Sequence, residues 1–277
     1  MIEGGLRLRG VGRSPVGDHP LVSVITVVRN GVDSIGRTIE AVLSQSYPSI
    51  EYIIIDGAST DGTLDVIRGF DDRIGYWRSE PDAGLYDAMN KGIELVTNPD
   101  SYVMFANSGD RLLSPESVQQ LVKEGQGADF VYGRELRTDG DASAVAGHEV
   151  SLNDLASDNI SHAASLTRRR VFDTVGRFDL RYRIVADYDF FVRCFSHPVS
   201  TRFVDRVIAE VGMFGLSETS FFLHARERID VICRRFGGTS RTAAVARIYC
   251  IDIPRHFLRG QLRRFGLLRF WRAIKAM

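Results

Sequence analysis

The chain has 277 residues, of which 44% are hydrophobic, and its formal net charge is zero. That length is sufficient for one large α/β domain, or for one domain with an appendage. No window holds the roughly 18 apolar residues of a membrane-spanning helix, and the three cysteines lack the number and spacing of a disulfide framework. We therefore expect a cytoplasmic, reducing environment.

The charges are distributed unevenly along the chain. Residues 226–277 hold 13 Lys and Arg but only 3 Asp and Glu, so the remaining residues carry a net charge of −10. A basic C-terminal segment indicates contact with something anionic. The two candidates are nucleic acid and the cytoplasmic leaflet of a membrane.

The chain begins with a predicted leader and a first strand–helix unit. Residues 1–19 contain no apolar segment and are expected to be disordered. The run LVSVITVV at 21–28 is β-branched and apolar, which is typical of a buried strand. Asp33 or Ser34 can cap the helix that follows, and Pro48 ends it.

Strands and helices continue to alternate up to residue 133. Further apolar runs predict strands at 51–55, 74–77, 102–105 and 129–133. Helices are predicted from Thr63 to Phe70 and, from an apolar stripe, from Leu85 to Val96. Such alternation favours βαβ units, so the first half of the chain predicts a Rossmann-like, mostly parallel sheet of the nucleotide-binding type.

The second half of the chain has a weaker pattern. Residues 137–159 are polar and poorly periodic, which predicts a loop over the site. Residues 164–172 indicate a strand with its turn, and residues 187–195 indicate a helix. From Phe221 onward the pattern is helical and basic, so a basic helical extension is expected to follow the α/β domain.

Polar residues follow several of the predicted strands at the point where each ends. Asp56 follows the second strand, Glu80 and Asp82 follow the third, and Asn107 and Asp110 follow the fourth. In open α/β sheets, ligands bind at this edge. No glycine-rich phosphate loop stands at a strand–helix junction, which disfavours a dinucleotide site and a P-loop. An acidic edge without such a loop suggests that a divalent metal holds the phosphates.

Six segments of the chain carry a family resemblance. They are VSVITVVRN, IIIDGASTDGT, SEPDAGLYDAMNKGI, FANSGD, ISHAASLTRR and VADYDFFVRC. In this order they resemble family 2 glycosyltransferases of the GT-A fold, and most of all bacterial enzymes that build colanic-acid-type exopolysaccharides and lipid-linked glycans. The resemblance covers about residues 20–220 and implies an inverting transfer of one sugar from a nucleotide-diphosphate donor.

The resemblance also implies a division of the chain. A GT-A catalytic domain is expected at 20–222, with a nucleotide-binding half at 20–110 and an acceptor half at 111–222. A basic helical region is expected at 223–277.

Donor-binding residues follow from the same resemblance. In the family, the acid at the position of Asp56 binds the nucleobase, and the residues from Val27 to Arg29 line the base pocket. Many members have Pro-Thr-Tyr there, so the guanidinium plane of Arg29 would replace an aromatic lid. Asp82 is expected near the base or the ribose.

Three residues of the predicted helix 85–96 join the donor site in this interpretation. Asp87 and Lys91 lie four positions apart and share a helix face. Asn90 and Lys91 are expected to reach the phosphates or the sugar of the donor, whether this is a UDP-, GDP- or dTDP-sugar. The helix N-terminus adds a potential that favours an anion.

The expected metal site departs from the family pattern. The family usually has Asp-x-Asp-Asp after the fourth strand, whereas this chain has Asn107, Ser108, Gly109 and Asp110. Asp110 is then the expected ligand of Mg²⁺ or Mn²⁺, with Asn107 among the donor-binding residues. One carboxylate together with diphosphate oxygens and water can hold such an ion.

The resemblance assigns the catalytic base to Asp187. This carboxylate would remove the proton of the acceptor hydroxyl as its oxygen attacks the anomeric carbon from the face opposite the diphosphate. Partial burial that raises the pKa of Asp187 toward neutrality would suit this task. Asp189, two positions further on, is the alternative base.

Two further segments are expected on the acceptor side. His162 lies in SHAAS, which is similar to the Ser-His-Gln-Ala pattern on the acceptor side of the family, although a structural histidine is an equal alternative. Residues 214–217 stand where the family has Gly-Gly-x-Ser and are expected to close on the diphosphate.

Each of the acidic residues also has a plain structural explanation. Asp56 can be a turn residue, and Asp110 and Asp187 can cap the segments that follow them. Asp87 and Lys91 can be a surface ion pair.

The basic tail, residues 241–277, leaves two alternatives open. Apolar residues interleaved with arginines predict peripheral contact with the cytoplasmic face of a membrane, where a lipid-linked acceptor would lie. The alternative is a helical hairpin packed on the core. Rival functions for the whole chain are a nucleotidyltransferase and a non-catalytic module that binds a membrane or nucleic acid, although no nucleic acid is expected.

Overall fold

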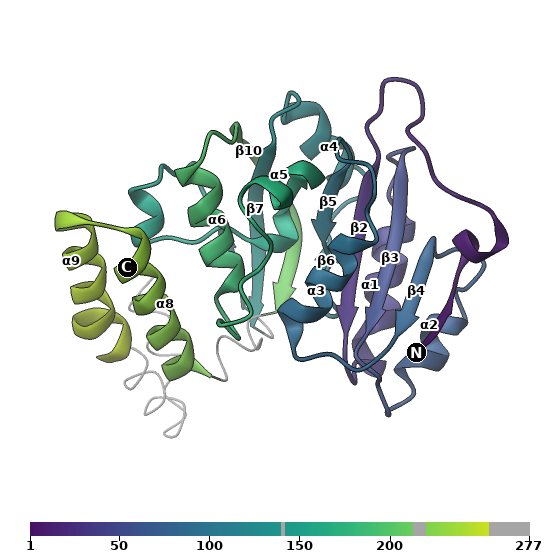
Figure 1. Cartoon of the computed structure of the whole chain (residues 1–277), viewed down its shortest axis with the longest axis horizontal. Coiled ribbons are helices and arrows are strands. Elements are labelled where there is room, and N and C mark those ends of the chain that lie inside the picture. Colours follow the sequence, from purple (N-terminus) through teal and green to yellow (C-terminus); the bar gives the residue numbers. More distant parts are fainter. Residues whose placement is uncertain (140–141, 213–219, 255–277) are drawn as a thin grey trace.

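The computed structural model describes residues 1–139, 142–212 and 220–254, and it has an α/β architecture (Figure 1). One sheet crosses the molecule, and helices cover both of its faces. Residues of the sheet alternate between two hydrophobic clusters, with Ile25 and Ile53 in one and Val24 and Ile54 in the other. Both faces are therefore buried, which explains why these strands are almost continuously apolar.

Strands and α-helices alternate along most of the described chain. The strands are β1 (Ile2–Gly4), β2 (Val22–Val28), β3 (Ile50–Asp56), β4 (Tyr76–Ser79), β5 (Tyr102–Phe105), β6 (Arg111–Leu112), β7 (Phe130–Asp139), β8 (Ala142–Ala146), β9 (Ser165–Arg168) and β10 (Thr201–Gly212). The α-helices are α1 (Val32–Leu43), α2 (Thr63–Arg68), α3 (Leu85–Glu94), α4 (Ser117–Glu124), α5 (Arg169–Thr174), α6 (Ala186–Ser196), α8 (Phe221–Arg235) and α9 (Gly238–Arg247).

Within the described residues the strands form one ten-stranded sheet. Its order is β1-β4-β3-β2-β5-β9-β7-β10-β6, and β8 pairs with β7. Strands β4, β3, β2 and β5 are parallel neighbours, and so are β7 and β10, whereas β9 runs antiparallel between β5 and β7. The predicted mostly parallel sheet is confirmed, and the carboxyl ends of β2 to β5 meet at one edge.

The N-terminal residues differ from the prediction, because they are not a disordered leader. Strand β1 pairs antiparallel with β4, with Ile2 opposite Ser79 and Gly4 opposite Trp77. The N–H of Gly5 donates to Asp71 Oδ1 at 2.7 Å. Without β1, the unpaired N–H and C=O groups of β4 would form the edge of the sheet. The leader therefore covers that edge, and Figure 1 shows the N-terminus beside β4.

Two elements of the second half also differ from the prediction. Residues 137–159 are not simply a loop, because they include the end of β7, the antiparallel strand β8 and a short 3₁₀ turn at Asp154–Ala156. Strand β10 has no counterpart among the predicted elements. Its register against β7 shifts between Phe203 and Val207 and again before Ala209, which breaks the period of two that identifies a strand.

Helix α1 starts earlier than predicted and is capped from another segment. It begins at Val32, so neither Asp33 nor Ser34 is its cap. The N–H of Val32 donates to Asp61 Oδ2 at 3.1 Å, and the N–H of Gly31 donates to Thr63 Oγ1 at 2.9 Å. The polar loop after β3 thus supplies the partners that a helix N-terminus needs.

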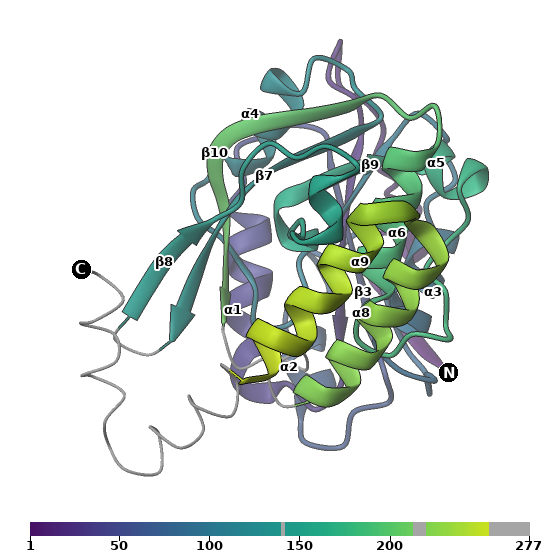
Figure 2. The ribbon, with the colours of Figure 1, turned by 90° about the vertical axis from the view of Figure 1, so that its left-hand side faces the viewer.

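The described part of the C-terminal region packs on α6 and its neighbours. Ala225, Val231, Ile232 and Ile248 belong to the same hydrophobic cluster as Phe190 of α6 and its neighbours. Figure 2 shows α8 and α9 side by side, next to α6. Residues 214–217 and 255–277, which carry two predictions, lie outside the described residues.

Candidate active site

Arg29, Asp56, Asp82, Asn107 and Asp110 lie at the edge where β2, β3, β4 and β5 end. Backbone hydrogen bonds continue past the strands and hold the following turns together. The N–H of Gly57 donates to Val28 O at 2.8 Å, that of Glu80 donates to Asp56 O at 3.0 Å, and that of Ser108 donates to Val27 O at 3.2 Å. Val27 itself is buried, so it contributes backbone to this edge.

Asp56 is held in place at the end of β3. Its side chain is fully buried, and its Oδ1 accepts from Ser59 Oγ at 2.5 Å. Its Oδ2 accepts from Ser79 Oγ at 2.5 Å and from the N–H of Ser59 at 3.1 Å. Both oxygens therefore face hydroxyl groups, and Asp56 organises the turn whether or not it also contacts a base.

Gly57 allows Arg29 and Asp82 to approach each other. A Cβ atom on Gly57 would lie 2.1 Å from Asp82 Oδ2 and 3.2 Å from Arg29 Cβ, so any larger residue would require the Asp82 carboxylate to move. Asp82 is fixed in turn by the N–H of Gly84, which donates to Oδ1 at 2.9 Å. Arg29, Asp56 and Asp82, three of the residues predicted to hold the nucleoside, thus converge.

The predicted residues of α3 contact their own surroundings. Lys91 Nζ lies 3.1 Å from Asp87 Oδ2 and donates to Pro81 O at 2.8 Å. Burial would raise the pKa of Asp87, but the N–H of Ala83 and the charge of Lys91 outweigh it and lower that pKa. Both residues therefore stabilise the turn that leads into α3, and their predicted contact with a donor stays a prediction.

Asn90 takes a different position from the predicted one. Its Nδ2 donates to Phe178 O at 2.9 Å, and its Oδ1 accepts from the N–H of Phe178 at 3.1 Å. Both the nitrogen and the oxygen of the Asn90 amide are therefore hydrogen-bonded to Phe178, which joins α3 to the segment before α6. This geometry supports a structural role for Asn90 and gives no support to a donor contact.

Asp110 and Asp187 lie on either side of one imidazole ring. His162 Nε2 is 3.5 Å from Asp110 Oδ2, and His162 Nδ1 is 3.3 Å from Asp187 Oδ2. Asp110 follows β5, His162 stands in the 3₁₀ turn before β9, and Asp187 is in the first turn of α6. The predicted metal ligand, the acceptor-side histidine and the predicted base therefore form one cluster.

The two carboxylates determine the charge of His162. Burial alone would lower the pKa of His162, but the hydrogen bonds and charges of Asp110 and Asp187 outweigh burial and raise that pKa to about 10. The ring is therefore an imidazolium at neutral pH, and it donates at both nitrogens.

The surroundings of Asp187 lower its pKa. Burial is the largest influence and raises it, but hydrogen bonds from His162, Tyr86 and the N–H of Tyr188, together with the charge of His162, outweigh burial and lower it. The condition that burial raises this pKa toward neutrality is therefore not met. The lowered pKa keeps Asp187 ionised, which is the form that accepts a proton.

Tyr86 is a site residue that the sequence interpretation missed. Its hydroxyl lies 2.8 Å from Asp187 Oδ1 and 2.7 Å from Ile184 O. Burial and the charge of Asp187 raise the pKa of Tyr86 well above its ordinary value, so the hydroxyl keeps its proton. In the sequence, Tyr86 looks like any tyrosine on the buried face of a helix, so no signal marks it.

Asp189 has a structural role in place of the predicted alternative one. It is fully buried, and Arg193 Nε donates to its Oδ2 at 2.9 Å while Arg235 Nε donates to its Oδ1 at 3.0 Å. Asp189 has no exposed surface, whereas 13% of the Asp187 side chain is exposed, so an acceptor hydroxyl can reach Asp187 and not Asp189. Asp187 is therefore the better candidate for the base.

Asp110 fits a divalent cation in its chemistry. In the part of the chain that the structure describes, no group of three or more His, Cys, Asp or Glu side chains is arranged to hold a metal ion. The side-chain amide of Asn107 lies 3.0 Å from His162 Nε2, and because a protonated Nε2 can only donate, the amide oxygen is the atom that faces it. The Asp110 carboxylate supplies hard oxygen donors of the kind that Mg²⁺ and Mn²⁺ prefer.

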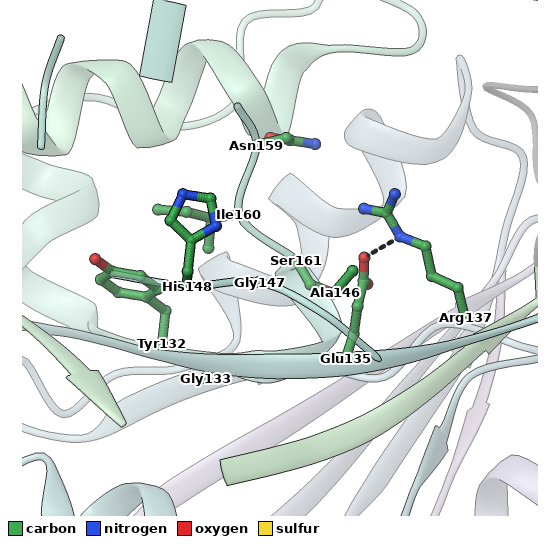
Figure 3. Close-up of a pocket in the computed structure, with 10 residues that line it drawn as sticks. All are labelled: Tyr132, Gly133, Glu135, Arg137, Ala146, Gly147, His148, Asn159, Ile160 and Ser161. Carbon is green, nitrogen blue, oxygen red and sulfur yellow. Dashed lines mark hydrogen bonds and ion pairs between the residues drawn. The ribbon is translucent and has the colours of Figure 1, made fainter. Parts of the chain in front are cut away.

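Two cavities lie away from this cluster. One of about 10 Å³ lies between the β7–β8 hairpin and the segment before His162, and the ion pair of Glu135 with Arg137 borders it (Figure 3). That volume suits a single water molecule and excludes a sugar. The other, of about 400 Å³, lies between the N-terminal residues and the core, where Arg7 and Glu51 line it. Neither is lined by a predicted site residue.

Comparison with known proteins defines the class to which this fold and site belong. Residues 23–176 match the model of Glycosyl transferase family 2, which covers more than half of the chain. A "PGL/p-HBAD biosynthesis glycosyltransferase" of Mycobacterium bovis is 32% identical over 209 residues, which make up 72% of this chain and 80% of the relative. The chain belongs to glycosyltransferase family 2.

Solved structures agree on the fold. A structure of residues 1–349 of S. aureus TarS with UDP-GlcNAc is similar with a TM-score of 0.62 at 14% identity, covering 83% of this chain and 73% of that one. The mannosyltransferase PcManGT from Pyrobaculum calidifontis, in complex with GDP-Man and Mn²⁺, has a TM-score of 0.61 at 15% identity and covers 98% and 89%. The resemblance to the GT-A fold is thereby confirmed.

Proposed function

We propose that this chain is an inverting, metal-dependent glycosyltransferase that moves one sugar from a nucleotide-diphosphate donor to a hydroxyl of a lipid-linked glycan. The product would belong to a cell-surface polysaccharide or glycolipid. One observation carries the proposal. Asp110 and Asp187 contact opposite nitrogens of the same imidazole, at the edge of the sheet where Asp56 also lies. The expected metal side and the expected base are therefore one imidazole ring apart.

Asp187 acts as the base in this mechanism. Its lowered pKa keeps it ionised, and it takes the proton of the acceptor hydroxyl. The acceptor oxygen then forms a bond to the anomeric carbon, while the bond from that carbon to the diphosphate oxygen breaks with its electron pair. Attack from the face opposite the leaving group inverts the configuration. Tyr86 and His162 hold the carboxylate during this step.

The donor diphosphate would lie on the Asp110 side. Asp110 is the residue that would hold a divalent cation, and a bound cation would offset the negative charge that develops on the leaving diphosphate. Arg29, Asp56 and Asp82 would hold the nucleoside. The neighbours support such a donor, since TarS was solved with UDP-GlcNAc and PcManGT with GDP-Man and Mn²⁺.

Peripheral contact with a membrane is the second part of the proposal. Within the described residues, no helix is both long and apolar enough to cross a bilayer. Tyr249 and Ile251 are exposed, at 58% and 40%, in the same segment as Arg241 and Arg247. Apolar side chains beside arginines suit the interface of an anionic leaflet, which is where a lipid-linked acceptor would lie. We place this contact on the cytoplasmic face.

A screen of sugar nucleotides tests the proposed function. The full chain is incubated with UDP-, GDP- and dTDP-sugars, Mn²⁺ and a lipid extract, and release of the nucleoside diphosphate is measured. We expect one donor to be turned over and Asp187→Asn to lose transfer while the same nucleotide still raises its melting temperature. Equal loss of transfer and nucleotide binding would refute the assignment of Asp187 as the base.

A further inference from the structure

Helix α8 places an acid against the backbone that precedes Asp187. Glu227 is buried, with 7% of its surface exposed. Its Oε1 accepts the N–H of Arg183 at 2.9 Å, and its Oε2 accepts the N–H groups of Ile184 at 2.9 Å and Val185 at 3.3 Å. One side chain thus binds three consecutive backbone N–H groups, from a position more than 40 residues later in the chain.

These contacts act at the start of the helix that bears Asp187. Val185 is the N-cap residue of α6, and it has no polar side chain with which to cap the helix. The N-terminus of a helix leaves N–H groups unpaired and attracts negative charge. Glu227 therefore stabilises the entry into α6 from outside, two positions before Asp187.

Other contacts of α8 hold the same stretch of chain. Asp230 Oδ2 accepts from the Tyr182 hydroxyl at 2.8 Å, one turn of α8 beyond Glu227. Further along the helix, Arg235 donates to Asp189 in the first turn of α6. Helix α8 thus contacts this stretch before, within and after the segment that Glu227 binds.

We propose that Glu227 is a positioning residue that sets the location of the Asp187 carboxylate. The inference rests on the proposed function, in which Asp187 is the base. Three N–H groups that converge on one carboxylate allow a single backbone path between Tyr182 and α6. A displacement of about 1 Å in a catalytic group reduces a rate by as much as about 100-fold. None of the hydrogen bonds that Glu227 makes in the described chain reaches Asp110 or His162, so it acts through the backbone that leads to Asp187.

Two full-length variants on the same helix separate positioning from general stability. Glu227→Gln keeps the size of the side chain but replaces one acceptor oxygen by an amide that cannot accept an N–H. Val231→Ala removes apolar contacts of a fully buried residue one turn later and leaves the backbone partners of Glu227 intact. Three properties are measured for each: amide hydrogen exchange, turnover of the donor found in the screen, and the melting shift that its nucleoside diphosphate causes with Mn²⁺.

We expect Glu227→Gln to exchange the amides of 183–185 at least about 10-fold faster and to lower kcat about 10- to 100-fold. Its nucleotide-induced melting shift should equal that of the wild type, because the donor side is unchanged. Val231→Ala should lower the melting temperature but keep kcat within about 3-fold. If both variants lose kcat equally for the same loss in melting temperature, Glu227 has no specific role and the proposal is wrong.

A second variant tests the proposal if Glu227→Gln does not fold. Glu227→Asp keeps the charge but shortens the side chain, so it should lower kcat while the nucleotide still binds. Turnover at the wild-type rate in Glu227→Asp would overturn the proposal. If Asp187→Asn transfers sugar at the wild-type rate, the proposed function fails and the positioning role fails with it. If Asp187→Asn transfers sugar slowly but Glu227→Gln transfers it at the wild-type rate, only the positioning role of Glu227 is refuted and the proposed function stands.

Discussion

The replacement Asp189→Asn distinguishes the two acids of α6. Asp187 belongs to the candidate active site, whereas Asp189 pairs with Arg193 and Arg235 in the interior. Asp189 is fully buried, and the Arg193 side chain is 8% exposed. Removing the carboxylate charge leaves the guanidinium of Arg193 buried without a counter-charge. We therefore expect a loss of stability with little direct effect on sugar transfer.

The size of the loss follows from the burial of each partner. Removing one partner of a buried ion pair costs about 3–5 kcal/mol. Arg193 keeps hydrogen bonds to the carbonyl oxygens of Val175, Gly176 and Arg177, which places the expected cost near the lower value, about 3 kcal/mol. At roughly 2–4 °C per kcal/mol for a chain of about this size, the melting temperature falls by about 6–12 °C.

Thermal unfolding followed by circular dichroism measures this effect. Arg235→Gln is the matched control, because 32% of the Arg235 side chain is exposed and Asp189 keeps its ion pair with Arg193, so this variant should lose less stability than Asp189→Asn. Transfer is then compared at a temperature where every variant is folded. A fall of less than about 2 °C for Asp189→Asn would refute the energetic reasoning. Loss of transfer in the folded variant would restore Asp189 as the alternative base.

Three further predictions concern the metal side, the tyrosine and the tail. In the wild type, UDP, GDP or dTDP should raise the melting temperature more with Mn²⁺ than with a chelator, and Asp110→Ala should remove that difference. A difference that persists in the variant would count against Asp110 as the metal ligand. Tyr86→Phe should cost about 1–3 kcal/mol in thermal unfolding, because the charged Asp187 loses a buried hydrogen bond, and an unchanged melting temperature would contradict that bond. The double variant Tyr249→Ser, Ile251→Ser, at two exposed positions, should weaken co-sedimentation of the full chain with anionic vesicles; unchanged binding would exclude these two side chains from the membrane contact.

Local sequence patterns were sufficient to locate the strands and helices whose own residues are mostly apolar and buried. Strands β2, β3 and β5 are mostly apolar and are buried at nearly every position, and α3 has an apolar residue on each turn of one face. Because burial on both faces leaves such a clear composition, these elements could be placed within a few residues.

Elements that depend on a distant partner could not be placed in this way. Strand β1 has three residues, and its first two are exposed, so its own sequence contains no strand signal. It exists because β4 offers an unpaired edge. Strand β10 follows β7 closely but with shifted register, and each shift removes the alternation that a reader of the sequence would look for.

For the candidate site, too, the sequence indicated some features and only the tertiary structure showed the others. Strand-end position and the family resemblance were enough to select Asp56, Asp110, His162 and Asp187 as candidates from the amino-acid sequence. Their mutual arrangement, the charge of the imidazole, and the parts played by Tyr86 and Glu227 appeared only with the folded chain. The physical reason is that periodicity and composition report what each short segment buries, whereas a carboxylate's partners and pKa depend on segments that packing brings together from 40 to 100 residues away.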